Sequence, residues 1–203
     1  KEVIRAHRRI VFNGNGYTED WVKEAGRRGL FNLPACADAF PCFIAENNID
    51  LFTKHHVFTR EEIFSRYEII QENYVKTINI EAKTMCSMMY KTFLPSLLSY
   101  IETIAEATEK TKKVLPSAPV ISQEKLLSTL ARLYTSISEM TEELKSAIAG
   151  ADSIGDSMEK VRYFNYTVLA KMNGLRSFVD EAEALIPESF LTYPTYDKLL
   201  FSI

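Results

Sequence analysis

The chain has 203 residues, of which 46% are apolar and 25% charged, and its formal net charge is −3. These proportions are ordinary for a globular protein, and so small a charge argues against nucleic acid or a membrane surface as a partner. No apolar run reaches the ~18–20 residues that span a bilayer, and no signal peptide is expected. The odd set of cysteines, Cys36, Cys42 and Cys86, has no metal-site spacing and indicates reduced thiols in a cytoplasmic protein.

Short elements are predicted in the first part of the chain. Residues 1–10 have the pattern of the last turns of a helix, and residues 11–17, VFNGNGY, predict a turn because glycine tolerates positive φ. Thr18 predicts the N-cap of a helix that continues to about Arg28, and Gly29 should end it.

A less regular stretch is predicted next. Residues 32–41 should form a loop, because Pro34 and Pro41 interrupt regular structure. Short helical turns are predicted at residues 43–47 and 48–56. The chain is thereby divided into a connecting segment, residues 1–58, and a helical bundle, residues 59–203.

A long helix is predicted from Thr59 to about Lys113. Thr59 and Glu62 have the spacing of a capping box. Proline removes a backbone donor and clashes with the preceding turn, at a cost of about 3 kcal/mol in a helix interior. We therefore expect a kink at Pro95, or two helices that meet end to end.

Two heptad-patterned helices decide the fold class. The first should begin at an N-cap on Ser122 and end near Gly150, and the second should begin with a capping box of Asp156 and Glu159 and end at Pro187. Their apolar positions alternate steps of four and three residues: Leu126, Leu130, Leu133, Ile137, Met140, Leu144 and Ala147, then Met158, Val161, Asn165, Val168, Met172, Leu175, Val179, Ala182 and Ile186. Such stripes pack against other helices. The short loop between them, residues 151–155, predicts an antiparallel hairpin in an all-α, long-helix bundle.

The two ends of the chain carry further signals. The aromatic and apolar tail, residues 193–203, is expected to dock on the bundle. The first residue is Lys1 rather than methionine, which indicates a fragment of a longer protein.

One glycine pair invites comparison with a phosphate-binding loop. Gly14-Asn15-Gly16 lacks the third glycine of the dinucleotide fingerprint, and no Gly-Lys-Ser/Thr follows it. A plain turn is therefore favoured. The preceding basic residues are more typical of a solvated face or a contact with another domain than of an anion site: Arg5, His7, Arg8 and Arg9.

Few residues have the spacing of metal ligands. His55 and His56 are adjacent and so point to different sides of a helix. Glu68 and Glu72 share a face and could chelate a cation, but a solvated face is commoner. We predict no catalytic residue, no metal site and no cofactor site in this segment.

Cys86 and Asn165 are predicted to take part in the packing between helices. Cys86 lies among Met85, Met88 and Met89, which predicts core filling rather than a nucleophile. Asn165 is the one polar residue of the second stripe, and a buried asparagine there would set helix register. A ligand role for Asn165 is the weaker alternative.

Three blocks are distinctive together: residues 9–28, RIVFNGNGYTEDWVKEAGRR, residues 65–85, SRYEIIQENYVKTINIEAKTM, and residues 178–203, with VDEAEALIP and YPTYDKLLFSI. In this order the chain resembles the C-terminal part of a type III glutamine synthetase, the large bacterial form. The resemblance covers essentially the whole chain and rests on long runs rather than on a catalytic signature.

The resemblance implies a parent enzyme that makes glutamine from glutamate and ammonia, with ATP and Mg or Mn, in a double-ringed homo-oligomer. The family's catalytic residues lie in a β-rich domain before the matched region, so none carries over to this chain. Residues 14–21 look like the closing segment of that domain, and the rest looks like a helical extension. On this resemblance, residues 1–58 combine the closing segment of the catalytic domain with connecting short helices, and residues 59–203 form the C-terminal bundle. The implied partners are the catalytic domain of the same chain and further copies, and the implied role is to shape the oligomer.

Two other functions stay open. The heptad faces could belong to a free-standing helical module that binds a partner protein. A small helical enzyme or metal carrier using Glu68, Glu72 and either His55 or His56 is less favoured.

Overall fold

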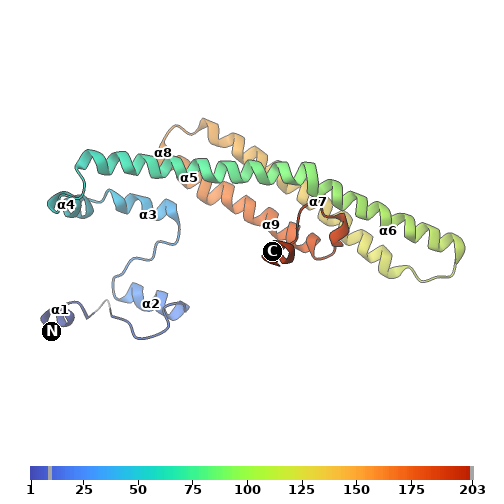
Figure 1. Cartoon of the computed structure of the whole chain (residues 1–203), viewed down its shortest axis with the longest axis horizontal. Coiled ribbons are helices and arrows are strands. Elements are labelled where there is room, and N and C mark those ends of the chain that lie inside the picture. Colours follow the sequence, from blue (N-terminus) through green and yellow to red (C-terminus); the bar gives the residue numbers. More distant parts are fainter. Residues whose placement is uncertain (9–10, 202–203) are drawn as a thin grey trace. The chain divides into compact units, whose positions relative to one another are not determined.

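Helices account for all of the regular structure in residues 1–8 and 11–201, the part of the chain that the computed structural model describes (Figure 1). The predicted all-α class is therefore confirmed. The chain forms two compact units, residues 1–67 and residues 68–203, and the boundary lies inside helix α5, Arg60–Met88. The predicted division after residue 58 concerns a catalytic domain and stays a prediction.

The N-terminal unit contains short helices and the first turns of α5. The short helices are α1, Glu2–Ala6, α2, Glu19–Arg27, α3, Cys36–Phe43, and α4, Glu46–Lys54. The buried apolar residues of this unit are Ala25, Ala37, Ile49 and Ile63, whereas Tyr17 and Phe31 are almost fully exposed. The unit therefore has only a small core of its own.

Two predictions for this unit are wrong. Residues 36–43 form helix α3 instead of a loop, although Pro41 lies inside it. Pro41 removes the donor that would bond back to the Ala37 carbonyl, so this short helix forms with one bond fewer. Residues 46–54 form the single helix α4 rather than parts of two separate turns. The predicted helix end at Ile10 lies outside the described residues.

Helix α2 begins and ends where the sequence predicts. Thr18 is its N-cap, but the Thr18 hydroxyl donates to the Asn15 carbonyl at 3.0 Å and makes no capping bond to α2. At the other end Gly29 has a φ of 74°, which favours glycine. The Leu30 N–H donates to the Ala25 carbonyl and the Gly29 N–H to the Gly26 carbonyl, which are the two bonds of a Schellman motif.

The capping box at the start of α5 is confirmed in full. The Thr59 N–H donates to the Glu62 carboxylate at 2.8 Å, and the Glu62 N–H donates to the Thr59 hydroxyl at 3.2 Å. Two backbone donors that the first turn would leave unpaired are thus satisfied.

The C-terminal unit is a bundle of long helices. After the rest of α5 it contains the π-helical segment η2, Met89–Phe93, then α6, Leu94–Val114, α7, Ile121–Gly150, the 3₁₀ turn η3, Ala151–Ser153, α8, Ser157–Tyr163, the π segment η4, Phe164–Val168, α9, Leu169–Glu183, the 3₁₀ turn η5, Glu188–Phe190, and α10, Tyr196–Phe201. Helix α7 packs mainly against α6 and α9 (Figure 1). The predicted antiparallel hairpin is confirmed.

The helical path continues through Pro95. Figure 1 follows α5 through η2 into α6 without a break. In η2 the Leu94 N–H donates to the Met89 carbonyl, five residues back. This wider turn directly precedes Pro95, the second residue of α6, where a missing donor is best tolerated. Instead of a break between two helices, the junction is a π-helical segment within one continuous helical path.

The heptad stripes supply much of the bundle core. The buried cluster contains Ile78, Ala82, Cys86, Met89, Phe93, Leu94, Leu97, Leu130, Leu133, Ile137, Leu144, Ala147, Ala151, Phe164, Val168, Leu175, Val179, Ala182 and Ile186. The stripe residues Leu126, Met140, Met158, Asn165 and Met172 are only half-buried. Phe164, which the stripe omits, is 1% exposed because η4 changes the register of the last helix there.

The connections around α7 confirm one predicted cap and correct another. The N-cap of α7 is Val120, so Ser122 lies inside the helix and the predicted cap is wrong. Val120 is 4% exposed, and its burial places the helix start two residues earlier. After the predicted loop, the Asp156 carboxylate accepts a bond from the Glu159 N–H at 2.7 Å, as expected for an N-cap.

The first part of the tail docks on the bundle, and its end does not. Just before the predicted tail, the Phe190 ring lies 5.0 Å from that of Tyr100. In the tail itself, the Tyr193 hydroxyl donates to the Glu183 carboxylate at 2.6 Å. In contrast, Leu200 and Phe201 of α10 are more than 70% exposed. The predicted docking therefore holds as far as Tyr193, and residues 202–203 lie outside the described part of the chain.

Candidate functional site

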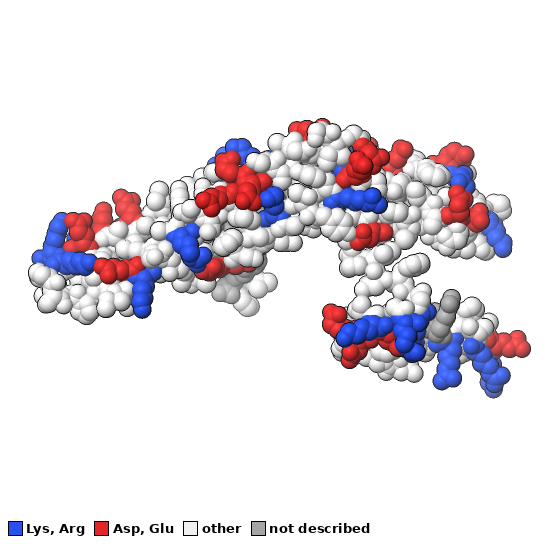
Figure 2. All heavy atoms as spheres, turned by 180° about the vertical axis from the view of Figure 1, so that it is seen from behind, with Lys and Arg blue, Asp and Glu red and all other residues white. Residues whose placement is uncertain are grey.

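Charged side chains of both signs are interspersed on the surface. Figure 2 shows them mixed along the long helices, without a broad field of one sign on the face in view. Across residues 1–8 and 11–201, no helix has the length and apolar character needed to cross a membrane.

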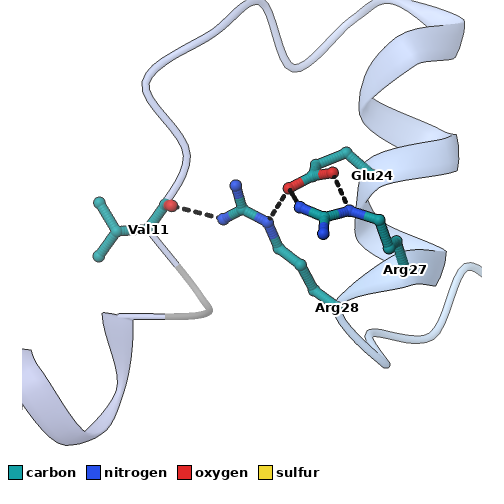
Figure 3. A network of polar contacts seen from close by, with 4 residues as sticks. All are labelled: Val11, Glu24, Arg27 and Arg28. Atoms are coloured by element: carbon teal, nitrogen blue, oxygen red, sulfur yellow. Dashed lines mark hydrogen bonds and ion pairs between the residues drawn. The ribbon is translucent and has the colours of Figure 1, made fainter.

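A polar cluster joins α2 to the segment before it (Figure 3). The Glu24 carboxylate accepts a hydrogen bond from Arg27 Nε at 2.7 Å and one from Arg28 Nε at 2.6 Å. These bonds, from Arg27 first and Arg28 second, lower the pKa of Glu24 to about 2. Arg28 also donates to the Val11 carbonyl at 2.6 Å, so one guanidinium ties α2 to the incoming chain.

Aromatic rings complete this cluster. The Phe12 and Trp21 rings lie 4.3 Å apart, and the Arg28 guanidinium carbon lies 5.6 Å from the first ring centroid and 5.9 Å from the second. A Cβ atom on Gly14 would lie 2.3 Å from the Phe12 ring. Gly14 is therefore needed for the ring to fold over the turn.

The glycine turn has the structure of a chain reversal. The Asn15 side-chain oxygen accepts a bond from the Tyr17 N–H at 3.0 Å, which is an Asx turn. No strand precedes this turn in residues 1–8 or 11–13, as a dinucleotide loop would require. The local bonds match the plain turn that the sequence favours.

The histidine pair ends helix α4. His55 is the C-cap, and His56 has a φ of 53°, a left-handed conformation that is unusual for a residue with a side chain. The Val57 N–H donates to the Phe52 carbonyl and the His56 N–H to the Thr53 carbonyl, which again form a Schellman motif. The region has the geometry of a helix terminus.

The structure does not gather the candidate metal ligands. Glu72 pairs with Lys76 at 3.1 Å on the exposed face of α5, and Glu68 is exposed as well. Among the described side chains, those of residues 1–8, 11–195 and 198–201, no group of three or more His, Cys, Asp or Glu could hold a metal ion.

Cys86 and Asn165 take part in helix packing. Cys86 is 8% exposed, and burial raises the pKa of its thiol, so the reactive thiolate is disfavoured. The Asn165 side-chain oxygen accepts a bond from the Tyr74 hydroxyl at 2.7 Å and so links η4 to α5. Asn165 thus bonds to another helix from a half-buried position, and its role in setting helix register stays a prediction.

The C-terminal unit contains a groove of about 680 Å³, which we call the methionine groove. It lies between the end of α5 with η2, the helix α9, and the tail. The side chains that line it are Ile80, Glu81, Thr84, Met85, Met88, Met89, Met172, Arg176, Val179, Glu183, Ile186, Glu188, Leu191, Tyr193, Pro194, Thr195 and Leu199. Met85, Met88 and Met89, expected to fill the core, therefore also form a wall of this open site.

The sequence carried a partial signal for this groove. Three methionines within five residues were evident, but their partner Met172 is 83 positions beyond Met89. Only the pairing of α5 with α9 brings them together. The cluster around Glu24 was likewise hidden, because its contacts to Val11 and Phe12 depend on how the turn folds.

Comparisons with known proteins agree with this architecture. The family model described as the glutamine synthetase C-terminal domain matches residues 1–112. A glutamine synthetase of Butyrivibrio fibrisolvens is 42% identical over 203 residues, which cover all of this chain and 29% of that protein. A type-3 glutamine synthetase of Dictyostelium discoideum is 30% identical over 205 residues, covering 99% of this chain and 28% of that protein.

A third relative extends the same result. A glutamine synthetase of Bacteroides fragilis (strain YCH46) is 25% identical over 206 residues, covering the whole chain and 28% of that protein. The chain thus spans less than a third of the length of these curated relatives. The resemblance to the C-terminal part of a type III glutamine synthetase is confirmed. Because the family model covers more than half of its residues, the chain belongs to the glutamine synthetase C-terminal domain family.

Proposed function

We propose that this chain is the C-terminal helical part of a cytoplasmic glutamine synthetase, which ligates ammonia to glutamate with ATP and Mg²⁺ or Mn²⁺. Its relatives of that name match it along its whole length, with this chain in their C-terminal part. Within the enzyme the chain packs on the catalytic domain and shapes the homo-oligomer. It supplies no catalytic, metal-binding or nucleotide-binding residue.

The observation that supports a packing role is the exposed apolar surface of the N-terminal unit. Tyr17 is 101% exposed and Phe31 89%, and Val3 and Ile4 are each about 70% exposed. Single exposed apolar residues are common, but a unit with a small core and several large exposed ones is typical of a surface that another part of a protein covers. The catalytic domain of the same chain is the partner that the family suggests.

A charge substitution tests this packing in the full-length enzyme. Tyr17→Asp combined with Phe31→Asp should lower the melting temperature by several degrees, because both carboxylates would be buried at the contact. Asn32→Asp is the matched control, since it adds a carboxylate at an exposed polar position beside Phe31. If the double variant melts like the control, residues 17 and 31 face solvent and the packing proposal fails.

A truncation tests the role in assembly. Removal of residues 59–203 from the full-length enzyme should convert the oligomer into smaller species, as measured by sedimentation velocity and native mass spectrometry. Glutamine synthesis should fall with the loss of assembly. An enzyme that kept both its full oligomer and its activity after this truncation would rule out the structural role.

A further inference from the structure

We propose that the methionine groove binds a small organic cation, with an apolar body and one ammonium or guanidinium group. This ligand site is a separate proposal from the packing role, and neither proposal depends on the other. Small-molecule sites are concave, mostly apolar, and about 300–1,000 Å³ in volume. The groove, at about 680 Å³, lies in the middle of that range.

The wall of the groove suits an apolar body of variable shape. Four of the six methionines of the chain line it: Met85, Met88, Met89 and Met172. Methionine has three rotatable bonds and a polarisable sulfur, so such a wall adapts to ligands of different outline. Met88 is 42% exposed and Ile80 is 65% exposed, so the wall is accessible from solvent.

The charges in the groove favour a cation over an anion. The one arginine that lines it, Arg176, is held by Asp180 at 2.5 Å, and Glu188 is held by Lys198 at 2.6 Å. These two pairs largely cancel. Two lining carboxylates remain, Glu81 on α5 and Glu183 on α9, and neither takes part in an ion pair with the described side chains, which exclude those of residues 196–197.

The bond that Glu183 does make is to a neutral group. Its partner is the Tyr193 hydroxyl at 2.6 Å. Burial, and then the bond to Glu183, raise the pKa of Tyr193, so the phenol stays protonated and neutral. The groove thus combines an adaptable apolar wall with two negative charges on opposite helices, which complements an amphiphilic cation.

Three probes with the same chain and different head groups test the proposal in the full-length enzyme: n-octylammonium, 1-octanol and octanoate. Binding is measured by isothermal titration calorimetry and by saturation-transfer NMR, well below micelle-forming concentrations. Octylammonium should bind saturably, and at least tenfold more tightly than octanoate. Added salt should narrow the difference, because it screens the attraction between exposed charges.

Two sets of variants locate the site. Glu81→Gln with Glu183→Gln keeps an acceptor for Tyr193 but removes both charges, and it should abolish the preference for octylammonium over octanol. Glu139→Gln, on the exposed face of α7 and outside the groove, should leave that preference unchanged. Thr84→Trp should fill the groove and weaken all three probes at least fivefold.

Specific outcomes would overturn the assignment. Octanoate binding as tightly as octylammonium would refute the choice of a cation. Unchanged binding in Thr84→Trp would refute the groove as the site. Saturable binding of none of the probes would refute a small-molecule site of this chemistry altogether.

Discussion

The two units of the chain hold their helices by different means. In the C-terminal unit, Leu97, Leu133 and Val168 are completely buried among long helices. In the N-terminal unit, Arg28 joins a carboxylate, a backbone carbonyl and two aromatic rings at the surface. The buried core of the C-terminal unit is stabilised by the burial of apolar side chains. The exposed polar cluster around Arg28 holds the local conformation of the N-terminal unit but contributes little to its stability, and large apolar side chains of that unit stay exposed.

The largest effect is expected in the core of the C-terminal unit. Leu97→Ala should lower the free energy of unfolding by about 2–5 kcal/mol, because a fully buried leucine leaves a cavity. Leu98→Ala is the adjacent control, since Leu98 is 51% exposed. Urea unfolding followed by circular dichroism gives both values. Equal losses would mean that Leu98 is also covered in the folded protein.

A smaller effect is expected where the last long helix contacts α5. Asn165→Ala removes an acceptor of the Tyr74 hydroxyl, and the loss of one such hydrogen bond costs about 0.5–1.5 kcal/mol. Combined with Tyr74→Phe, the loss should be less than the sum of the single losses, because both changes remove the same bond. Additive losses in urea unfolding would show that the bond contributes nothing to stability.

A small gain in stability is expected at the end of α4. His56→Gly should raise the free energy of unfolding by up to about 1 kcal/mol, because glycine adopts the left-handed conformation without strain. His55→Gly should destabilise, since His55 has a φ of −94° and gains nothing from glycine. Thermal unfolding of both variants gives the two changes in stability. A stabilised His55→Gly variant would contradict the explanation that the left-handed conformation of His56 is the source of the gain.

The smallest effect on global stability, with a clear local signal, is expected at Glu24. Because the folded pKa is lowered to about 2, the contribution of Glu24 is present above its ordinary pKa near 4.5 and is lost as the pH falls toward 2. Trp21 is the only tryptophan and lies in this cluster, so its fluorescence should change across that window. Glu24→Gln should abolish the change, and Glu19→Gln should preserve it. An identical titration in Glu24→Gln would exclude Glu24 as its origin.

Local signals in the sequence predicted much of the fold, because capping and burial on one helix face depend on nearby residues. Thr59 with Glu62 and Asp156 with Glu159 mark real helix starts, and Leu130, Leu133 and Ile137 lie in the core as their spacing predicts. The position of Phe164 in the core could not be predicted in this way. Its burial depends on η4, where the helix departs from the regular period that the heptad pattern assumes.

Features that join residues far apart in the chain could not be predicted from the sequence, for a different reason. The methionine groove requires Met85 and Met172 to meet, and the cluster around Arg28 requires Val11 and Phe12 to fold back on α2. Helix α3 departs from the loop predicted for residues 32–41, because proline disfavours a helix interior but does not forbid it. In α3 the helix is short enough for Pro41 to lie near its end.

The π-helical segment η2 has a consequence for the history of this family. Its backbone bonds reach back five residues instead of four, so it contains one more residue than an α-helix of the same turns. A relative with an unbroken α-helix in this position should therefore align with a gap of a single residue between Met89 and Phe93. Lineages could then be sorted by whether they carry that insertion, independently of their overall identity to this chain.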